Sequence, residues 1–297
     1  MAADGRRPVR ARDDDSDVYP AATGRRRFVK GVVGGAALAG TGVAGSAVVQ
    51  LSTAPSGRGG GVLQYFGIEL TDGPAPRGMP LIPVRIDSEG FLSGLFPPAE
   101  EREVGGRTLP VAEADVGGTT YSTEWFQYCG VQSIPAVAPG AEQDDAFRYD
   151  EGGYAWQREA VSPGQRIHVD DFADYREWRN EIGSAGLGKP ATGTWRSVDV
   201  PGEETLPIQV VRVADRLFDR MVADPVSGAF VEAAAPEGFL AWLNKCTHFC
   251  CVPGYKQTQQ AVAFGAANAV YCPCHQSVYD PFSVVQESFV ALPRPDE

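Results

Sequence analysis

The residues best suited to chemistry in this sequence are cysteines and histidines that gather near its C-terminal end. Five of the six cysteines and two of the three histidines lie between positions 246 and 275. They occupy two short segments, Cys246–Cys251 (CTHFCC) and Cys272–Asp280 (CPCHQSVYD). Thiolates and imidazoles are the ligands that iron and zinc prefer, so this concentration predicts a metal centre.

The spacings C-x-H-x2-C and C-x-C-H-x-S-x-Y resemble the Rieske iron–sulfur family, over about residues 205–297. The resemblance implies one [2Fe–2S] cluster with two cysteines on one iron and two histidines on the other. It implies a fold in which these loops form a cluster-binding subdomain. By motif position, the implied ligands are Cys246, Cys272, His248 and His275. The resemblance also implies a disulfide between Cys251 and Cys274 that ties the two loops together.

The implied chemistry is one-electron transfer coupled to proton transfer. Two neutral imidazoles in place of thiolates raise the potential to about −150 to +300 mV, from roughly −400 mV for an all-cysteine site. His275 and His248 would accept a hydrogen bond, an electron and a proton from quinol. Ser277 and Tyr279 stand where the family has hydroxyl donors that favour the reduced state. Residues 292–295 resemble the proline-rich loop that shields the cluster.

The segments depart from the family pattern at three points. Cys250 and Gln276 replace glycines, so either these loops avoid positive φ or their backbone is altered. The spacing of 23 residues between His248 and Cys272 predicts an added hairpin around Gln257–Ala267. A zinc site with the same ligands is the alternative, but it explains neither the extra cysteine pair nor the hydroxyls. The third histidine, His168, lies in a polar stretch and is interpreted as a surface residue.

Two cysteines, Cys129 and Cys250, have no place in the family pattern. Because an exported protein meets oxidising conditions, they can form a second disulfide. Such a bridge would lie where the family contacts its quinol-binding partner. Two buried free thiols are therefore the favoured interpretation, and the disulfide is the alternative.

Around these segments the sequence predicts a mostly β protein with antiparallel sheets. The chain has 35 Gly and 23 Pro in 297 residues, which is typical of many turns and short strands. Residues 208–213 and Phe239–Leu243 read as strands, the second buried and leading into Cys246. Tyr271 ends another strand before Cys272, and the two cysteine loops are expected to leave adjacent strands. A helix is expected over about Asp170–Asn180, with its three aromatic residues buried.

The N-terminal part predicts export and membrane anchoring. Arg25–Lys30 (RRRFVK) resembles a twin-arginine export signal, a route that carries folded proteins. Residues 31–51 carry no charge and match one membrane span, although a cleaved signal peptide is the alternative. The expected organisation is a cytoplasmic tail at 1–30, an anchor at 31–51, a flexible linker at 52–61, a β-rich region of unknown role at 62–190 and the Rieske domain at 191–297.

Charge separates the two parts of the chain. The net charge is −12, and residues 52–297 carry 18 Lys and Arg against 33 Asp and Glu. An acidic body repels phosphate backbones, so nucleic acid is not an expected partner. The basic residues precede the apolar segment, which places the N-terminus in the cytoplasm and the cluster domain on the outer face of the cell membrane.

The favoured function is that of an oxidoreductase subunit in a respiratory chain. It would be the Rieske subunit of a cytochrome bc-type, quinol–cytochrome c reductase complex, with a cytochrome b-type membrane subunit and quinol as partners. The electron acceptor would be a cytochrome c or a blue-copper protein. The alternative is the small Rieske subunit of an exported molybdenum oxidoreductase of the arsenite-oxidase type. A dioxygenase ferredoxin is disfavoured, because that branch lacks the Cys251–Cys274 pair.

Overall fold

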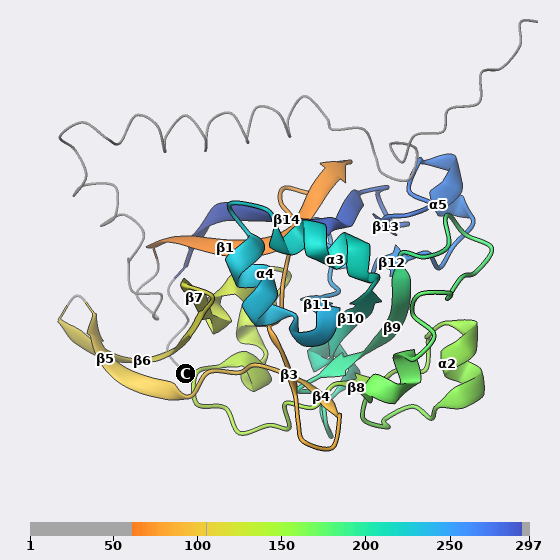
Figure 1. Ribbon diagram of the computed structural model, residues 1–297. Helices are drawn as coiled ribbons and strands as arrows, with labels where there is room; N and C mark the ends of the chain where they lie inside the picture. Colours follow the sequence, from red (N-terminus) through yellow and green to blue (C-terminus); the bar gives the residue numbers. More distant parts are fainter. Residues whose placement is uncertain (1–60, 105, 293–297) are drawn as a thin grey trace, which may run out of the picture.

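The computed structural model describes residues 61–104 and 106–292 (Figure 1). The export signal, the membrane anchor, residues 52–60 of the linker and Pro293–Pro295 lie outside this range. None of the helices in the described part is long and apolar enough to span a membrane. Gly61, the last residue of the expected linker, is already the first residue of a strand.

The largest sheet has five antiparallel strands in the order β12-β13-β14-β1-β2. Its centre is the long pairing of β1 with β14, from Gly61 opposite Ala291 to Asp72 opposite Val278. Leu63 and Tyr65 lie on one face of β1, while Phe66, Ile68 and Leu70 lie on the other. All five are buried, so the middle of the strand is covered on both faces. The bounds are β1 (Gly61–Asp72), β2 (Met79–Pro80), β12 (Gly254–Tyr255), β13 (Val270–Tyr271) and β14 (Val278–Ala291).

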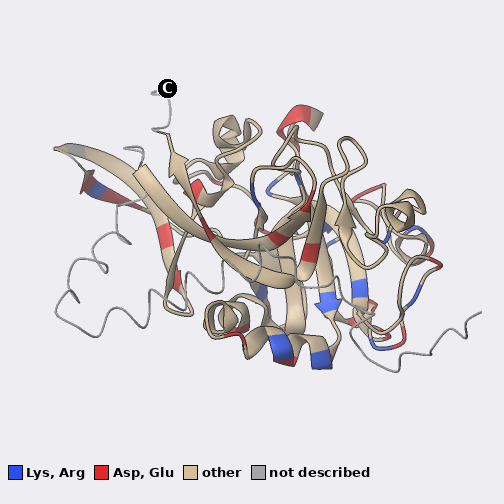
Figure 2. Cartoon of the chain, turned by 90° about the horizontal axis from the view of Figure 1, so that it is seen from above, with Lys and Arg blue, Asp and Glu red and all other residues tan. Residues whose placement is uncertain are grey.

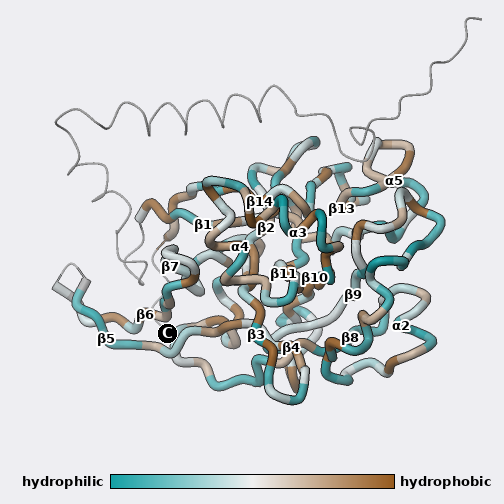
Figure 3. Tube along the Cα trace, in the orientation of Figure 1, coloured by the Kyte–Doolittle hydropathy of each residue, from teal (hydrophilic) through white to brown (hydrophobic). Residues whose placement is uncertain are grey.

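A second antiparallel sheet has the order β11-β10-β9-β8. All five residues of β11 are buried, which confirms the strand expected at 239–243, and β10 confirms the strand expected at 208–213. Hydrophobic residues gather at the centre of the molecule around these strands (Figure 3). The bounds are β8 (Arg148–Tyr149), β9 (Gly188–Trp195), β10 (Leu206–Val213) and β11 (Phe239–Leu243).

The two sheets meet through the chain segment that follows β2. Leu81 forms a bridge with Trp242 of β11, and the Ile82 amide donates to the Ala241 carbonyl at 2.9 Å. The expectation that the cysteine loops leave adjacent strands is therefore wrong, because β11 and β13 lie in different sheets. The loops come together because the sheets are joined at this edge.

Two smaller sheets complete the β structure, which confirms a mostly β, antiparallel fold. They are the pair β3-β4 and the sheet β5-β6-β7, whose β5 and β6 project from the body as an arm. Acidic residues of this arm appear in red in Figure 2. The bounds are β3 (Val84–Ile86), β4 (Leu92–Gly94), β5 (Ala99–Val104), β6 (Arg107–Val116) and β7 (Thr119–Ser122).

Residues on both sides of position 190 share one hydrophobic core. Its members run from Leu63 to Ala291, and β1 from the first part is the main partner of β14 from the second. The core of the expected Rieske domain thus includes the first strand of the region before it.

The helices are short and differ from expectation. The expected helix at 170–180 is wrong, because Val169–Phe172 forms a 3₁₀ turn and further turns follow, although Phe172, Tyr175 and Trp178 are buried as expected. The hairpin expected around 257–267 is also wrong, since that stretch contains α5 (Gln260–Ala263). Among the described residues, the α-helices are α2 (Ala155–Ala160), α3 (Asp215–Val222), α4 (Gly228–Ala234) and α5. The 3₁₀ helices of this part are Thr123–Phe126, Val131–Ser133, Pro135–Val137, Val169–Phe172, Gly202–Glu204 and Pro236–Gly238.

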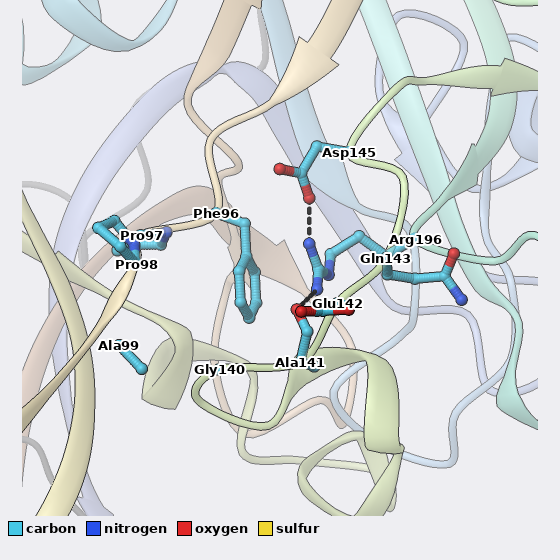
Figure 4. A pocket seen from close by; sticks show the side chains of 10 residues that line it. All are labelled: Phe96, Pro97, Pro98, Ala99, Gly140, Ala141, Glu142, Gln143, Asp145 and Arg196. Carbon is cyan, nitrogen blue, oxygen red and sulfur yellow. Dashed lines mark hydrogen bonds and ion pairs between the residues drawn. The ribbon is translucent and has the colours of Figure 1, made fainter.

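A buried arginine fastens the loops before β8 to the second sheet. Arg196, only 2% exposed, donates to the carbonyls of Ala136 and Ala141, each at 2.6 Å, and pairs with Asp145. Its guanidinium lies 3.5 Å from the centre of the Phe96 ring (Figure 4). A cavity of about 500 Å³ lies beside this arginine. Because the guanidinium already bonds to two carbonyls and to Asp145, we infer that Arg196 has a structural role and does not bind a ligand there.

Candidate metal centre

The first cysteine loop leaves β11 and closes on itself through two backbone hydrogen bonds. The Cys246 amide donates to the Cys251 carbonyl at 2.8 Å, and the Cys250 amide donates to the Cys246 carbonyl at 3.1 Å. The turn needs a left-handed residue, and Cys250 supplies it with φ of 63°. This conformation is uncommon for a residue other than glycine.

The second loop, between β13 and β14, repeats the same turn. The Cys272 amide donates to the Ser277 carbonyl and the Gln276 amide to the Cys272 carbonyl, both at 2.9 Å. Gln276 takes the left-handed position with φ of 64°. Both loops therefore keep positive φ at the positions where glycine is usual, and the interpretation that they avoid it is wrong.

The two turns bring the sulfurs of Cys246 and Cys272 into hydrogen-bonding contact. Both are free thiols and both are 1% exposed. Backbone amides of His248 and Phe249 point at the Cys246 sulfur, and those of Cys274 and His275 point at the Cys272 sulfur. Amide dipoles aimed at sulfur favour thiolates, the form that binds a metal.

The hydrogen bond between the two sulfurs moves the pKa values of the two thiols apart. Donation from Cys272, together with Tyr279 and the backbone amides, lowers the pKa of Cys246 to about 5. The same hydrogen bond and burial raise the pKa of Cys272 above its usual value. The pair therefore loses its protons in two well-separated steps.

We expect the metal-free chain to hold one thiolate, on Cys246, at neutral pH. A pKa below the usual value means that the thiolate is present above that pKa and is lost as the pH falls through about 5. Thiolate absorbance near neutral pH, measured by ultraviolet titration, should match one thiolate and disappear in Cys246→Ser. Two equal transitions near the usual cysteine pKa would contradict the coupling.

The imidazole rings of the two histidines lie next to each other. The ring centres of His248 and His275 are 4.8 Å apart, with an angle of 81° between the planes. Nδ1 of His248 is buried and has no hydrogen-bond partner, which is costly for a polar nitrogen. A metal ion would satisfy this nitrogen. His275 is exposed, and the ring of Phe249 contacts both imidazoles.

A disulfide joins the loops, as the family resemblance implied. Cys251 and Cys274 are bonded, with 6.6 Å between their Cα atoms. The sulfurs of Cys251, Cys272 and Cys274 lie within 4.8 Å of one another, but two of them are consumed by this bond. The thiolates left for a metal are Cys246 and Cys272.

The second cysteine pair also forms a disulfide. Cys129 is bonded to Cys250, with 5.3 Å between Cα atoms, so the favoured interpretation of two free thiols is wrong. The bond is possible because the 3₁₀ helix Thr123–Phe126 is anchored in the core by Trp125 and Phe126 and delivers Cys129 to the loop. The only signal in the sequence was that these two cysteines have no other role, which made the disulfide the alternative interpretation.

Tyr279 and Ser277 are placed by different neighbours. The Tyr279 hydroxyl lies 3.2 Å from the Cys246 sulfur, and burial raises the pKa of Tyr279, so the hydroxyl keeps its proton. Ser277 is fully buried, and its oxygen accepts the Ala75 amide at 3.2 Å, which leaves its proton free to be donated. The Gly73 turn approaches so closely that a Cβ there would lie 2.5 Å from the Ser277 Cα.

Comparison with family models, curated proteins and solved structures finds no match. The interpretation of this centre therefore depends on its own geometry. Two thiolates and two imidazoles, one with an unpaired buried nitrogen, are a donor set that fits a [2Fe–2S] group or a single metal ion.

One contributor to the centre was not predicted. The Thr247 hydroxyl donates to the Arg77 carbonyl at 2.6 Å and lies 3.4 Å from the Tyr279 hydroxyl, so it links the first loop to the segment before β2. A polar residue between two ligands was its only signal in the sequence. His168 lies elsewhere: its Nε2 contacts the Glu89 carbonyl at 2.6 Å and its Nδ1 accepts the Asp170 amide at 3.1 Å, and its side chain is 23% exposed.

Proposed function

We propose that this chain is a Rieske-type electron carrier, in which Cys246, Cys272, His248 and His275 hold one [2Fe–2S] cluster. The observation that carries the proposal is the pair of matching turns, which bring two free thiols and two imidazoles together beneath a disulfide. Bound there, the cluster would supply a site that accepts one electron at a time.

The chain's own residues would accept the proton that a substrate releases with its electron. His275 is exposed, so its ring can receive a hydrogen bond from a substrate, whereas Nδ1 of His248 faces inward. Phe249, which is 65% exposed, adds an apolar surface next to His275 at the end of the first cysteine loop. This combination suits a quinol, which has a hydroxyl group on an apolar ring.

The favoured assembly is a quinol-oxidising complex of the cytochrome bc type. The support is the expected anchor at 31–51 and the exposed histidine, which together suit a tethered head that meets a cytochrome b-type subunit. The chain would work at the outer face of the cell membrane and pass electrons to a cytochrome c or a blue-copper protein.

The Cys129–Cys250 disulfide favours a second candidate. It fixes an added segment to the loop that carries Phe249, and a loop held in this way suits a permanent interface. A small subunit of an exported molybdenum oxidoreductase needs a fixed interface instead.

Purification in mild detergent tests the proposal and separates the candidates. We expect two irons per chain, the rhombic electron paramagnetic resonance signal of a Rieske centre and a copurifying b-type cytochrome. A molybdenum enzyme in its place would support the second candidate. One zinc per chain without iron would overturn both.

A further inference from the structure

The two cysteine loops share one turn geometry, yet they are held from outside in different ways. The disulfide between Cys251 and Cys274 is common to both loops and cannot make them differ. Only the first loop has a second covalent link among the described residues, from Cys250 to Cys129. The second loop is contacted by the turn at Gly73–Ala75, which is not covalently bound to it.

The segment Gln127–Cys129, here called the clasp, contacts the first loop at both ends of its turn. Cys129 is bonded to Cys250, and its sulfur lies 3.3 Å from the Cys246 carbonyl, the group that closes the turn. The buried Tyr128 ring places its hydroxyl 3.5 Å from the Leu243 carbonyl, just before the loop. The clasp therefore contacts the backbone before, at the start of and at the end of the turn that presents Cys246 and His248.

The clasp is itself fixed on two sides. On one side it continues the 3₁₀ helix whose Trp125 and Phe126 are buried in the core. On the other, the Gln127 side chain accepts the Leu292 amide at 2.8 Å and donates to the Leu292 carbonyl at 3.0 Å. A cross-link to so well-anchored a segment limits the motion of the loop more than a link to a free loop would.

The cross-link joins two residues with an unusual backbone. Cys250 and Cys129 both have positive φ, 63° and 53°, a conformation that is unfavourable for a residue other than glycine unless the surroundings enforce it. Gln276 has the same φ in the second loop, where Pro273–Gln276 are exposed. The first turn is thus enforced by a covalent bond, and the second is not.

We propose that the clasp holds the first loop in its ligand-presenting conformation before any metal binds, so that Cys246 and His248 form a preorganised half-site and the loop of Cys272 and His275 closes last. The inference rests on the proposed function only in taking these four residues as ligands. In this proposal, Cys129 and Gln127 are positioning residues. The first cysteine loop is ordered before metal binds, and the second cysteine loop becomes ordered after it.

Amide exchange in the full-length chain in detergent, with iron removed, tests this order. The Cys250 and Gln276 amides are matched probes, since each closes the same turn from an exposed residue. We expect the Cys250 amide to exchange at least tenfold more slowly than the Gln276 amide in the metal-free chain. Equal rates, or a metal-free chain whose core amides are all unprotected, would overturn the proposal.

Two variants isolate the cross-link. In Cys129→Ser with Cys250→Ser, the Cys250-position amide should lose its tenfold advantage while Gln276 exchanges as before. In Cys129→Ser with Cys250→Gly, glycine adopts positive φ without strain but has no cross-link, and the protection should again be lost. If the glycine variant stays as protected as the parent, the clasp is not what holds the loop. Absence of iron in the native chain would refute the proposed electron carrier without altering this exchange result.

Discussion

Replacing His275 by Ala is expected to abolish the metal centre. The variant leaves one imidazole and an opening toward solvent, because His275 is exposed whereas Nδ1 of His248 is buried. An iron with an open position binds water and is lost, so we expect iron to fall to roughly a tenth of the parent value or less. Iron analysis and the electron paramagnetic resonance signal of the purified variant measure this directly.

A matched control comes from the third histidine. His168 contacts the Glu89 carbonyl and the Asp170 amide, and neither belongs to the cysteine loops. His168→Ala should therefore keep its iron and its signal. A full signal in His275→Ala would show that this ring is not a ligand, whatever the control does.

Replacing Tyr279 by Phe is expected to lower the reduction potential while keeping the centre. The hydroxyl lies 3.2 Å from the Cys246 sulfur, and it donates more strongly when that sulfur carries more negative charge, as it does after reduction. Loss of about 1 kcal/mol of this preference corresponds to about 40 mV for one electron. Redox titration followed by circular dichroism or paramagnetic resonance gives the shift.

Tyr149→Phe serves as the control for this substitution. Tyr149 is also buried, and its hydroxyl donates to Asp171 at 2.9 Å rather than to a cysteine sulfur. It should shift the potential much less than Tyr279→Phe. Equal shifts in the two variants would mean that general polarity, and not the bond to sulfur, sets the potential.

The sequence predicted that the two cysteines and two histidines of these loops lie together, because each Cys–His pair is defined by local spacing. Cys246 with His248, and Cys272 with His275, each lie within one turn, and a short loop fixes their mutual position. The strands at 208–213 and 239–243 were predictable for a similar reason, since continuous apolar residues require burial. Helix α3 was missed, although Leu217 and Met221, four residues apart and both buried, carried its signal.

The features that were missed depend on contacts between distant residues. Cys129 and Cys250 are 121 positions apart, and nothing in either neighbourhood specifies the other. β11 and β13 belong to different sheets because each pairs with other strands, and the bridge from Leu81 to Trp242 joins the two sheets. Such pairings follow from the packing of whole sheets, which a one-dimensional pattern does not encode.

The pairing of β1 with β14 also dictates when this protein can fold. Gly61 pairs with Ala291, so the strand made first among the described residues must wait for the strand made last, about 230 residues later. At a synthesis rate of about 5–20 residues per second, that wait is roughly 10–50 s. During it, β1 lacks its main partner, and its apolar residues are open to chaperones or to aggregation. The main sheet can therefore close only after β14 has been made, however early β1 is available.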